Sequence, residues 1–112
     1  MKKINIIKKN MEFSDIIKNG TKFSNDIISI YVRKNNAHNR FGISISKKIG
    51  NAVVRNKYKR RIKDIIDKYK FMYDGLDMIF VSRLRLSDKN YSYIKESLDK
   101  LLDLIGEKYE KI

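Results

Sequence analysis

Residues 41–69 read FGISISKKIGNAVVRNKYKRRIKDIIDKY and carry the pattern that decides the fold. The first residues alternate, with Phe41, Ile43 and Ile45 on one side and small polar residues between them. A period of two residues is typical of a half-buried strand, so a strand is predicted here with only its apolar face in the core. Gly50 then interrupts the alternation and marks a turn.

A helix is predicted to begin at Ala52, directly after this turn. Asn51 is a favourable N-cap, because its side-chain oxygen can accept a hydrogen bond from an otherwise unpaired backbone N–H of the first helical turn. Apolar residues then recur three or four positions apart, which is the spacing of one buried helical stripe. The stripe consists of Val54, Tyr58, Ile62, Ile65 and Tyr69.

Positive charge is concentrated around the same stretch. Between Ile27 and Lys63 there are eleven basic residues and no acidic one, in a chain of formal net charge +13. Helical geometry puts polar residues opposite the apolar stripe, with Arg55 at its edge near the helix N-terminus, where a phosphate would meet both cations and unpaired N–H groups. This polar group contains Asn56, Lys59, Arg60 and Lys63. Most charge runs are simply solvated faces, but a solubilising surface normally mixes signs, so phosphate binding is favoured.

The segment SKKIGNAVVRNKYKRRIK, residues 46–63, resembles the signature of the bacterial ribonuclease P protein component. That family partners a catalytic RNA that removes the 5′ leader of precursor tRNA. The similarity is much longer than a short chance motif. The family usually has arginine at the position of Lys57 and an aliphatic residue at that of Tyr58, and lysine keeps the charge but loses the bidentate fork. The resemblance implies that the catalytic RNA is bound by Lys47, Lys48, Asn51, Arg55, Asn56, Lys57, Lys59, Arg60 and Lys63.

A short helix is predicted over Met11–Asn19, with Asn10 as its N-cap and Gly20 at its end. Taken alone, Phe13 is expected to be a core residue. The resemblance implies instead that this helix borders a groove for the precursor leader. Phe13 would then line the groove, and Ile17 stands where the family usually has a second aromatic residue.

Two strands are predicted next, over Thr21–Ser24 and Asp26–Arg33. In the longer one, Ile28, Ile30 and Val32 alternate toward the core. The opposite face carries Ile27, Ser29, Tyr31 and Arg33, to be paired with Arg40, Gly42, Ser44 and Ser46. An aromatic residue among cations suits single-stranded nucleic acid, whereas Tyr31 alone could simply be an amphipathic edge residue. With the resemblance, the implied leader-binding residues are Phe13, Ile17, Tyr31, Arg33 and Ser44.

The rest of the chain completes an α+β fold. The apolar strand Asp77–Arg83 is expected at the centre of the sheet, and a last helix capped near Asn90 carries a buried stripe. That stripe is Ile94, Leu98, Leu101, Leu102 and Ile105. The prediction is a single α/β sandwich domain of order αβββαβα with a four-stranded sheet. A βαβ unit is normally right-handed, but the resemblance implies a rare left-handed crossover.

Length and composition indicate the class of protein. The 112 residues are predicted to form one RNA-binding domain, 1–112, with 1–9 as a basic arm whose Ile4, Ile6 and Ile7 lie against it. A pI near 9.9 indicates a polyanionic partner. No apolar run approaches a membrane span, no signal peptide is evident, and there is no cysteine, so a cytoplasmic protein without a membrane partner is expected.

The sequence assigns no catalytic residue and no metal ligand. The acids are scattered outside the basic window, there is no cysteine, and one histidine cannot form a dyad with itself. The resemblance implies that the RNA subunit hydrolyses the phosphodiester with Mg²⁺ bound mainly by the RNA. Its implied partners are ribonuclease P RNA, in a one-to-one complex with a protein monomer, and precursor tRNA. The alternative is a non-catalytic RNA-binding module of ribosomal-protein or RNA-chaperone type, which would support no cleavage with that RNA.

Overall fold

The computed structural model describes residues 5–109, and the predicted contact of Ile4 with the domain lies outside them. The elements follow the predicted order αβββαβα. The helices are α1 (Met11–Asn19), α2 (Ala52–Lys68) and α3 (Tyr91–Tyr109), and the strands are β1 (Thr21–Ser24), β2 (Ile28–Lys34), β3 (Arg40–Ser44) and β4 (Leu76–Ser82). Two short 3₁₀ helices, η2 (Lys47–Ile49) and η3 (Leu84–Leu86), follow β3 and β4.

The strands form one mixed sheet in the order β1-β2-β4-β3. β1, β2 and β4 pair antiparallel, whereas β3 runs parallel to β4 and forms an edge of the sheet. The apolar strand β4 is therefore central, as its sequence predicted, and the fold class is confirmed. α2 connects the parallel neighbours β3 and β4, and the left-handed sense that the resemblance implies for this crossover stays a prediction.

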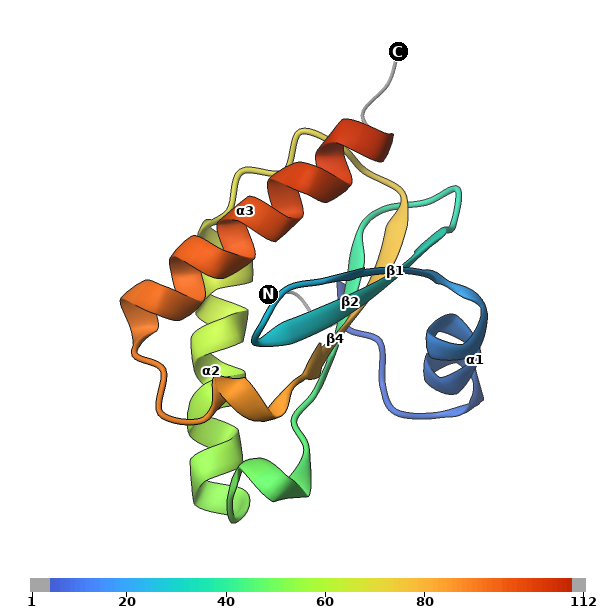
Figure 1. Ribbon diagram of the computed structural model, residues 1–112. Helices are drawn as coiled ribbons and strands as arrows, with labels where there is room; N and C mark the ends of the chain where they lie inside the picture. The colour runs from blue at the N-terminus through green and yellow to red at the C-terminus, as the bar shows by residue number, and fades with distance from the viewer. Residues whose placement is uncertain (1–4, 110–112) are drawn as a thin grey trace.

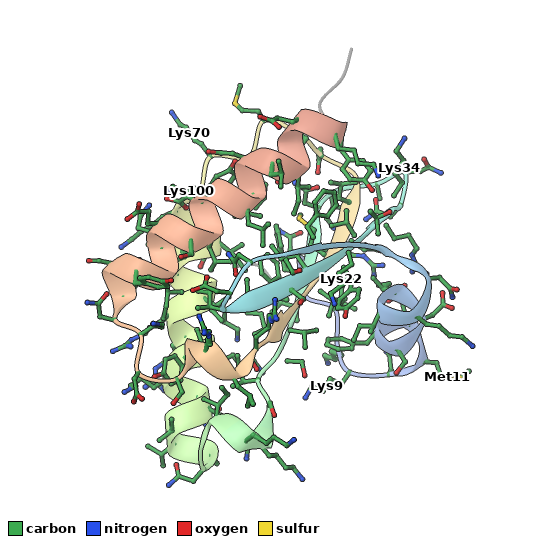
Figure 2. The ribbon with its side chains drawn as sticks, viewed as in Figure 1. Lys9, Met11, Lys22, Lys34, Lys70 and Lys100 are labelled. Atoms are coloured by element: carbon green, nitrogen blue, oxygen red, sulfur yellow. The ribbon has the colours of Figure 1, made fainter. Side chains whose placement is uncertain are left out.

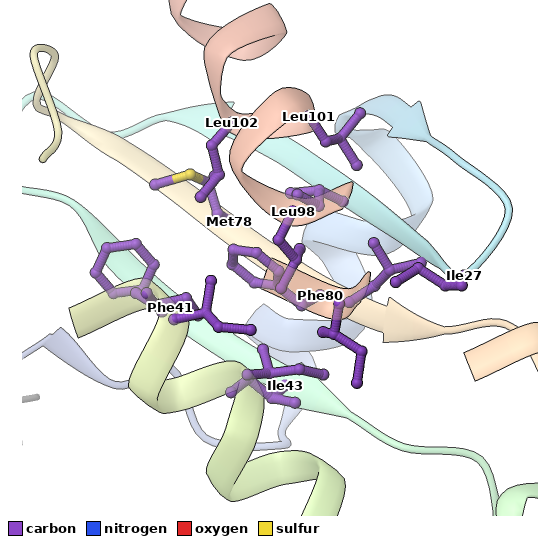
Figure 3. Close-up of a cluster of buried hydrophobic side chains, with 14 of the residues drawn as sticks. Ile27, Phe41, Ile43, Met78, Phe80, Leu98, Leu101 and Leu102 are labelled. Atoms are coloured by element: carbon purple, nitrogen blue, oxygen red, sulfur yellow. The ribbon is translucent and has the colours of Figure 1, made fainter. Parts of the chain in front are cut away.

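The sheet is the middle of three layers (Figure 1), with α2 and α3 on one face and α1 on the other. The main core lies between the sheet and the two long helices. It contains the predicted α3 stripe and most of the α2 stripe, in which Tyr58, Ile62 and Ile65 are buried while Val54 and Tyr69 lie at its margin. Figure 3 shows how Phe80 of β4 packs beside Leu98 of α3 in this core.

The second face of the sheet also buries apolar side chains, so the prediction that only one face is core was wrong. Ile7, Phe13, Ile16 and Ile79 form a smaller buried cluster beneath α1. Gly42 makes this packing possible, because a Cβ there would lie 2.8 Å from the Phe13 ring and from the Ile79 side chain. The helix can therefore approach β3 closely only where β3 has no side chain.

Two strand boundaries differ from the prediction for a local reason. The side chain of Asn25 accepts hydrogen bonds from the backbone N–H groups of Ile27 and Ile28, at 3.0 and 2.9 Å. Because of this turn, β2 begins only at Ile28. Ile27 therefore lies before the strand and packs in the main core instead of on the opposite face of the sheet. Ser46 lies beyond the end of β3, where its side chain caps η2 by accepting from Lys48 N–H.

Candidate nucleic-acid interface

The N-terminus of α2 and the preceding η2 present a group of cations to solvent. Asn51 caps α2 as predicted, accepting a hydrogen bond from Val54 N–H at 3.0 Å. Of the nine residues that the resemblance assigned to the catalytic RNA, Arg55 and Lys63 are half-buried. The exposed ones are Lys47, Lys48, Asn51, Asn56, Lys57, Lys59 and Arg60. The sequence thus located an exposed basic surface.

The cations of this surface have no acidic partner in the part of the chain that the structure describes. Within residues 5–109, no ion pair involves any of the seven lysine and arginine side chains among the nine. The first turn of α2 carries no acid, so the helix dipole and the side chains add positive potential at the same place. Arg55 lies at the margin, where its Nε is buried without a hydrogen-bond partner in the part of the chain described. An anion would be attracted to this surface from solution.

A groove of about 1080 Å³ follows α1. Its lining comes mostly from α1 and the residues before it, joined by one side chain each from β2 and β3. Phe13, Ile17, Arg33 and Ser44 line it, so four of the five residues predicted to bind the leader share one concavity. Tyr31 does not line the groove but packs half-buried against the small cluster beneath α1. Whether this groove takes a leader stays a prediction.

The Phe13 ring is a wall of this groove rather than a free stacking surface. Only 5% of the residue is exposed, because the ring packs against Gly42 and lies in the cluster beneath α1. Packing, which the sequence alone favoured for this residue, therefore dominates its environment. Tyr31 offers more accessible ring surface, with the Lys22 ammonium group 6.0 Å from its ring centroid.

The two arginines of the second sheet face are paired with carboxylates. Arg40 donates to Asp77 at 2.8 and 2.9 Å and to Glu12 at 2.9 Å. Arg33 donates to Asp15 at 2.6 Å and lies 3.5 Å from Asp77. We call these five residues the Asp77 network. The sequence predicted that both arginines are available to phosphates. In the structure their ion pairs instead connect α1 with β2, β3 and β4.

The Asp77 side chain is only 1% exposed, yet it is held as a carboxylate. Burial raises the pKa of Asp77, but hydrogen bonds from Arg40 and Asn35 and the nearby arginine charges outweigh burial and keep it below its ordinary value. Hydrogen bonds to Asp77 and to Glu12 raise the pKa of Arg40 above its ordinary value. No local pattern signals this network, because Glu12 and Asp15 lie far along the chain from Asp77 and from both arginines, and these groups meet only through folding.

A second basic recess, of about 720 Å³, lies where β3 and β4 end. Its three cations, Lys48, Arg83 and Arg85, line it together with one carboxylate, that of Asp26, and with Ser46, Ser82 and Leu84. Sequence reasoning assigned no role to the two arginines, although paired cations after a central strand were a visible signal. Tyr58 supports the neighbouring turn, since its hydroxyl accepts a hydrogen bond from Asp88 N–H at 2.9 Å. An aliphatic residue at position 58 could not make that bond.

Residues 5–109 contain no group of three or more His, Cys, Asp or Glu side chains placed to hold a metal ion. The Asp77 network does not serve, because its carboxylates are already paired with arginines. The described side chains therefore do not fit a resident metal. Within the same residues, none of the helices has the length and apolar character needed to cross a membrane.

These features define a small basic α+β protein with an exposed cationic surface on α2 and η2 and a groove along α1 on the other face of the sheet (Figure 1). The sequence model of the family described as Ribonuclease P matches residues 1–106. The chain belongs to this family.

Individual relatives agree with this assignment. The ribonuclease P protein component of Clostridium botulinum strain 657 is 42% identical over 107 residues, which cover 93% of this chain and 96% of the relative. The solved RNase P protein of Staphylococcus aureus superposes with a TM-score of 0.83 at 37% identity, over 90% of this chain and 94% of that one. The RNase P protein of Thermotoga maritima gives a TM-score of 0.81 at 29% identity, over 88% and 94%.

Proposed function

We propose that this protein is the protein subunit of a ribonuclease P holoenzyme that matures the 5′ ends of tRNA. In this proposal it binds ribonuclease P RNA, as a monomer in a one-to-one complex, through the cationic surface of α2 and η2. It binds the 5′ leader of precursor tRNA in the groove along α1. The observation that carries the proposal is the family match over nearly the whole chain.

The geometry supports different roles for the cationic surface of α2 and η2 and for the groove along α1. Within residues 5–109, the only α2 cation in an ion pair is Lys68, with Asp64 in the last turns, so the cations nearer the N-terminus of α2 can neutralise RNA phosphates and release counterions. The groove differs, because its arginine is paired and its walls are partly apolar. Such a groove suits unpaired bases better than a phosphate backbone alone.

Catalysis is assigned to the RNA. The described side chains offer no cluster of ligands for a metal, and in this proposal the chain supplies binding and local electrostatics. Mg²⁺, bound mainly by the RNA, would supply the activated water and the charge neutralisation for hydrolysis. Cations on α2 lower the repulsion between RNA segments and so reduce the Mg²⁺ concentration that folding of the RNA requires.

Reconstitution tests the proposal directly. The purified protein, a bacterial ribonuclease P RNA and a precursor tRNA are combined at a Mg²⁺ concentration too low for the RNA alone. We expect release of the intact leader and mature tRNA only when protein and RNA are both present. If the protein bound the RNA but did not stimulate cleavage, it would be an RNA-binding module of another kind.

Leader recognition is tested with Tyr31→Ala. If the Tyr31 ring stacks on a leader base, loss of the ring should weaken binding of precursor tRNA to the holoenzyme by about 1–3 kcal/mol, which is roughly five- to 150-fold in affinity. The affinity for mature tRNA, which has no leader, should not change. Equilibrium binding of the two RNAs measures the difference. Tyr31→Phe keeps the ring and should bind like the wild type. Phe13→Ala is unsuitable, since removal of a buried phenyl ring costs about 3–5 kcal/mol of stability.

Equal losses for both RNAs in Tyr31→Ala would show that Tyr31 supports the fold or the RNA contact and not the leader. Circular dichroism of the free variant separates these two cases.

The cationic surface is tested through the Mg²⁺ dependence of cleavage. Lys57 and Arg60 are exposed on one side of α2, and replacement of both by glutamine removes two positive charges without disturbing the core. We expect the double variant to need more Mg²⁺ for half-maximal cleavage and to recover at high Mg²⁺, because the metal supplies the missing countercharge. Cleavage assays over a Mg²⁺ series measure this shift.

The matched control replaces Lys70, beyond the end of α2, and Lys108 of α3, two exposed lysines that form no ion pair within residues 5–109, so it removes the same charge elsewhere. An unchanged Mg²⁺ requirement in Lys57→Gln/Arg60→Gln, or an equal shift in the control, would remove α2 as the RNA contact.

A further inference from the structure

Two carboxylates line the groove along α1, although the chain is strongly basic. Glu12 and Asp15 are three residues apart, so their side chains share one face of the helix, and both border the groove. The Glu12 side chain is 42% exposed and the Asp15 side chain 54%, so both can meet a bound ligand. In a chain of formal net charge +13, they would only weaken the binding of RNA unless they select among its chemical groups.

The surrounding cations do not cancel these two charges. The Asp77 network contains two arginines and three carboxylates, which leaves it one net negative charge at neutral pH. The groove is also lined by Lys9, which Figure 2 shows just ahead of α1, and by Lys18. Within residues 5–109, neither lysine forms an ion pair with Glu12 or Asp15. A phosphate that approached this wall would therefore meet two exposed carboxylates whose arginine partners are shared with Asp77.

The two carboxylates also keep free acceptor positions. Arg33 and Asn19 each donate one hydrogen bond to Asp15, to different oxygens, at 2.6 and 2.7 Å. Arg40 donates to both oxygens of Glu12, at 3.2 and 2.9 Å. A carboxylate has about four lone-pair sites, so each of the two can accept further N–H groups. The amino and ring N–H groups of unpaired RNA bases are such donors, whereas an ionised phosphate offers none.

We propose that Glu12 and Asp15 are specificity determinants of the groove, which turn the bases of a single-stranded RNA toward α1 and keep its phosphates away from that wall. Like charge repels the phosphates, and the free lone pairs accept N–H groups of the bases. The same wall rejects a duplex, because its phosphates face outward and its bases use their donors for pairing. Repulsion of the wrong group and attraction of the right one together give specificity. This role rests on the proposed function, in which the groove takes the leader of precursor tRNA.

An abasic leader tests the role of the carboxylates, because it keeps the phosphates and lacks the bases. Two precursors with the same tRNA and the same leader length, one with a natural and one with an abasic leader, are bound to the holoenzyme at equilibrium. Compared with the wild type, Asp15→Asn should bind the abasic precursor about fivefold more tightly, since one charge that repels a phosphate at a few ångströms is removed. Its affinity for the natural precursor should not rise, because there the bases and not the phosphates face residue 15.

The matched control is Glu107→Gln, which removes one exposed negative charge from α3. It should leave the preference for the natural leader at its wild-type value. Glu12→Gln provides a second variant in the groove if Asp15→Asn does not fold, and circular dichroism checks both. A wild-type preference in Asp15→Asn, or an equal gain in affinity for both leaders, would overturn the role of the carboxylates.

Binding to the free protein separates this role from the proposed function. Single-stranded oligoribonucleotides of one length, natural and abasic, are bound to the wild type and to Asp15→Asn without any other RNA. A smaller preference for the natural strand in Asp15→Asn would support the role even if the holoenzyme bound precursor and mature tRNA alike, which would contradict leader binding. An unchanged preference in both assays, with reconstituted cleavage intact, would contradict the role and leave the proposed function standing.

Discussion

Replacement of Asp77 by alanine is expected to lower the free energy of unfolding by about 3 kcal/mol. The Asp77 side chain is 1% exposed and accepts hydrogen bonds from Arg40 at 2.8 and 2.9 Å and from Asn35 at 2.7 Å. Breaking a buried ion pair costs about 3–5 kcal/mol, and the lower end applies because both arginines keep partners on α1. Chemical denaturation measures the change. Glu107→Ala, which removes an exposed carboxylate from α3, should change stability by less than about 0.5 kcal/mol.

The pH dependence of the same site follows from its pKa. Burial raises the pKa of Asp77, but Arg40 and Asn35 lower it by more than burial raises it, so the folded-state pKa lies below the ordinary 3.8. A carboxylate of this kind stabilises the fold above its unfolded-state pKa and loses that contribution as the pH falls through the folded-state value. The difference in the free energy of unfolding between the wild type and Asp77→Asn should therefore have its full size near neutral pH and shrink as the pH falls below 3.8. A constant difference through that range would show that the Asp77 charge is not what stabilises the fold.

The elements that the sequence predicted well are those with strong local signals. The α2 N-cap at Asn51, the apolar stripes of α2 and α3, and the central strand β4 were all found where periodicity and capping indicated them. Each of these signals depends on neighbours within a few residues. Tertiary contacts then agree with the local preference instead of overriding it.

The features that the sequence missed depend on contacts between distant residues. The cluster beneath α1 requires Phe13 to meet Ile79, and it requires Gly42 to leave room between them. In the sequence, Gly42 was only a small residue on a polar strand face. The face therefore looked open, although α1 covers part of it.

The same reason explains the error about the arginines. In the sequence, Arg33 and Arg40 resemble the lysines of α2 as cations available to phosphates, because no acidic residue is near them. Folding brings Asp77, Glu12 and Asp15 to them. Among residues 5–109, Arg33 and Arg40 therefore already have acidic partners on the groove side, whereas the cations of η2 and the N-terminal part of α2 form no ion pair.

This division leads to a salt dependence that should differ between the two sets of cations. If the α2 surface neutralises about six RNA phosphates, the slope of log affinity against log salt should be about −4 to −5, so raising salt fourfold should weaken binding to ribonuclease P RNA roughly 250- to 1000-fold. Lys57→Gln/Arg60→Gln should make the slope shallower by about 1 for each RNA phosphate that the variant no longer neutralises. Arg33→Gln removes one charge that Asp15 already compensates, so it should leave the slope nearly unchanged. Binding isotherms over a salt series measure all three proteins. A wild-type slope shallower than about −2 would exclude the α2 surface as the main RNA contact, and a shallower slope in Arg33→Gln would mean that its ion pairs open when RNA binds.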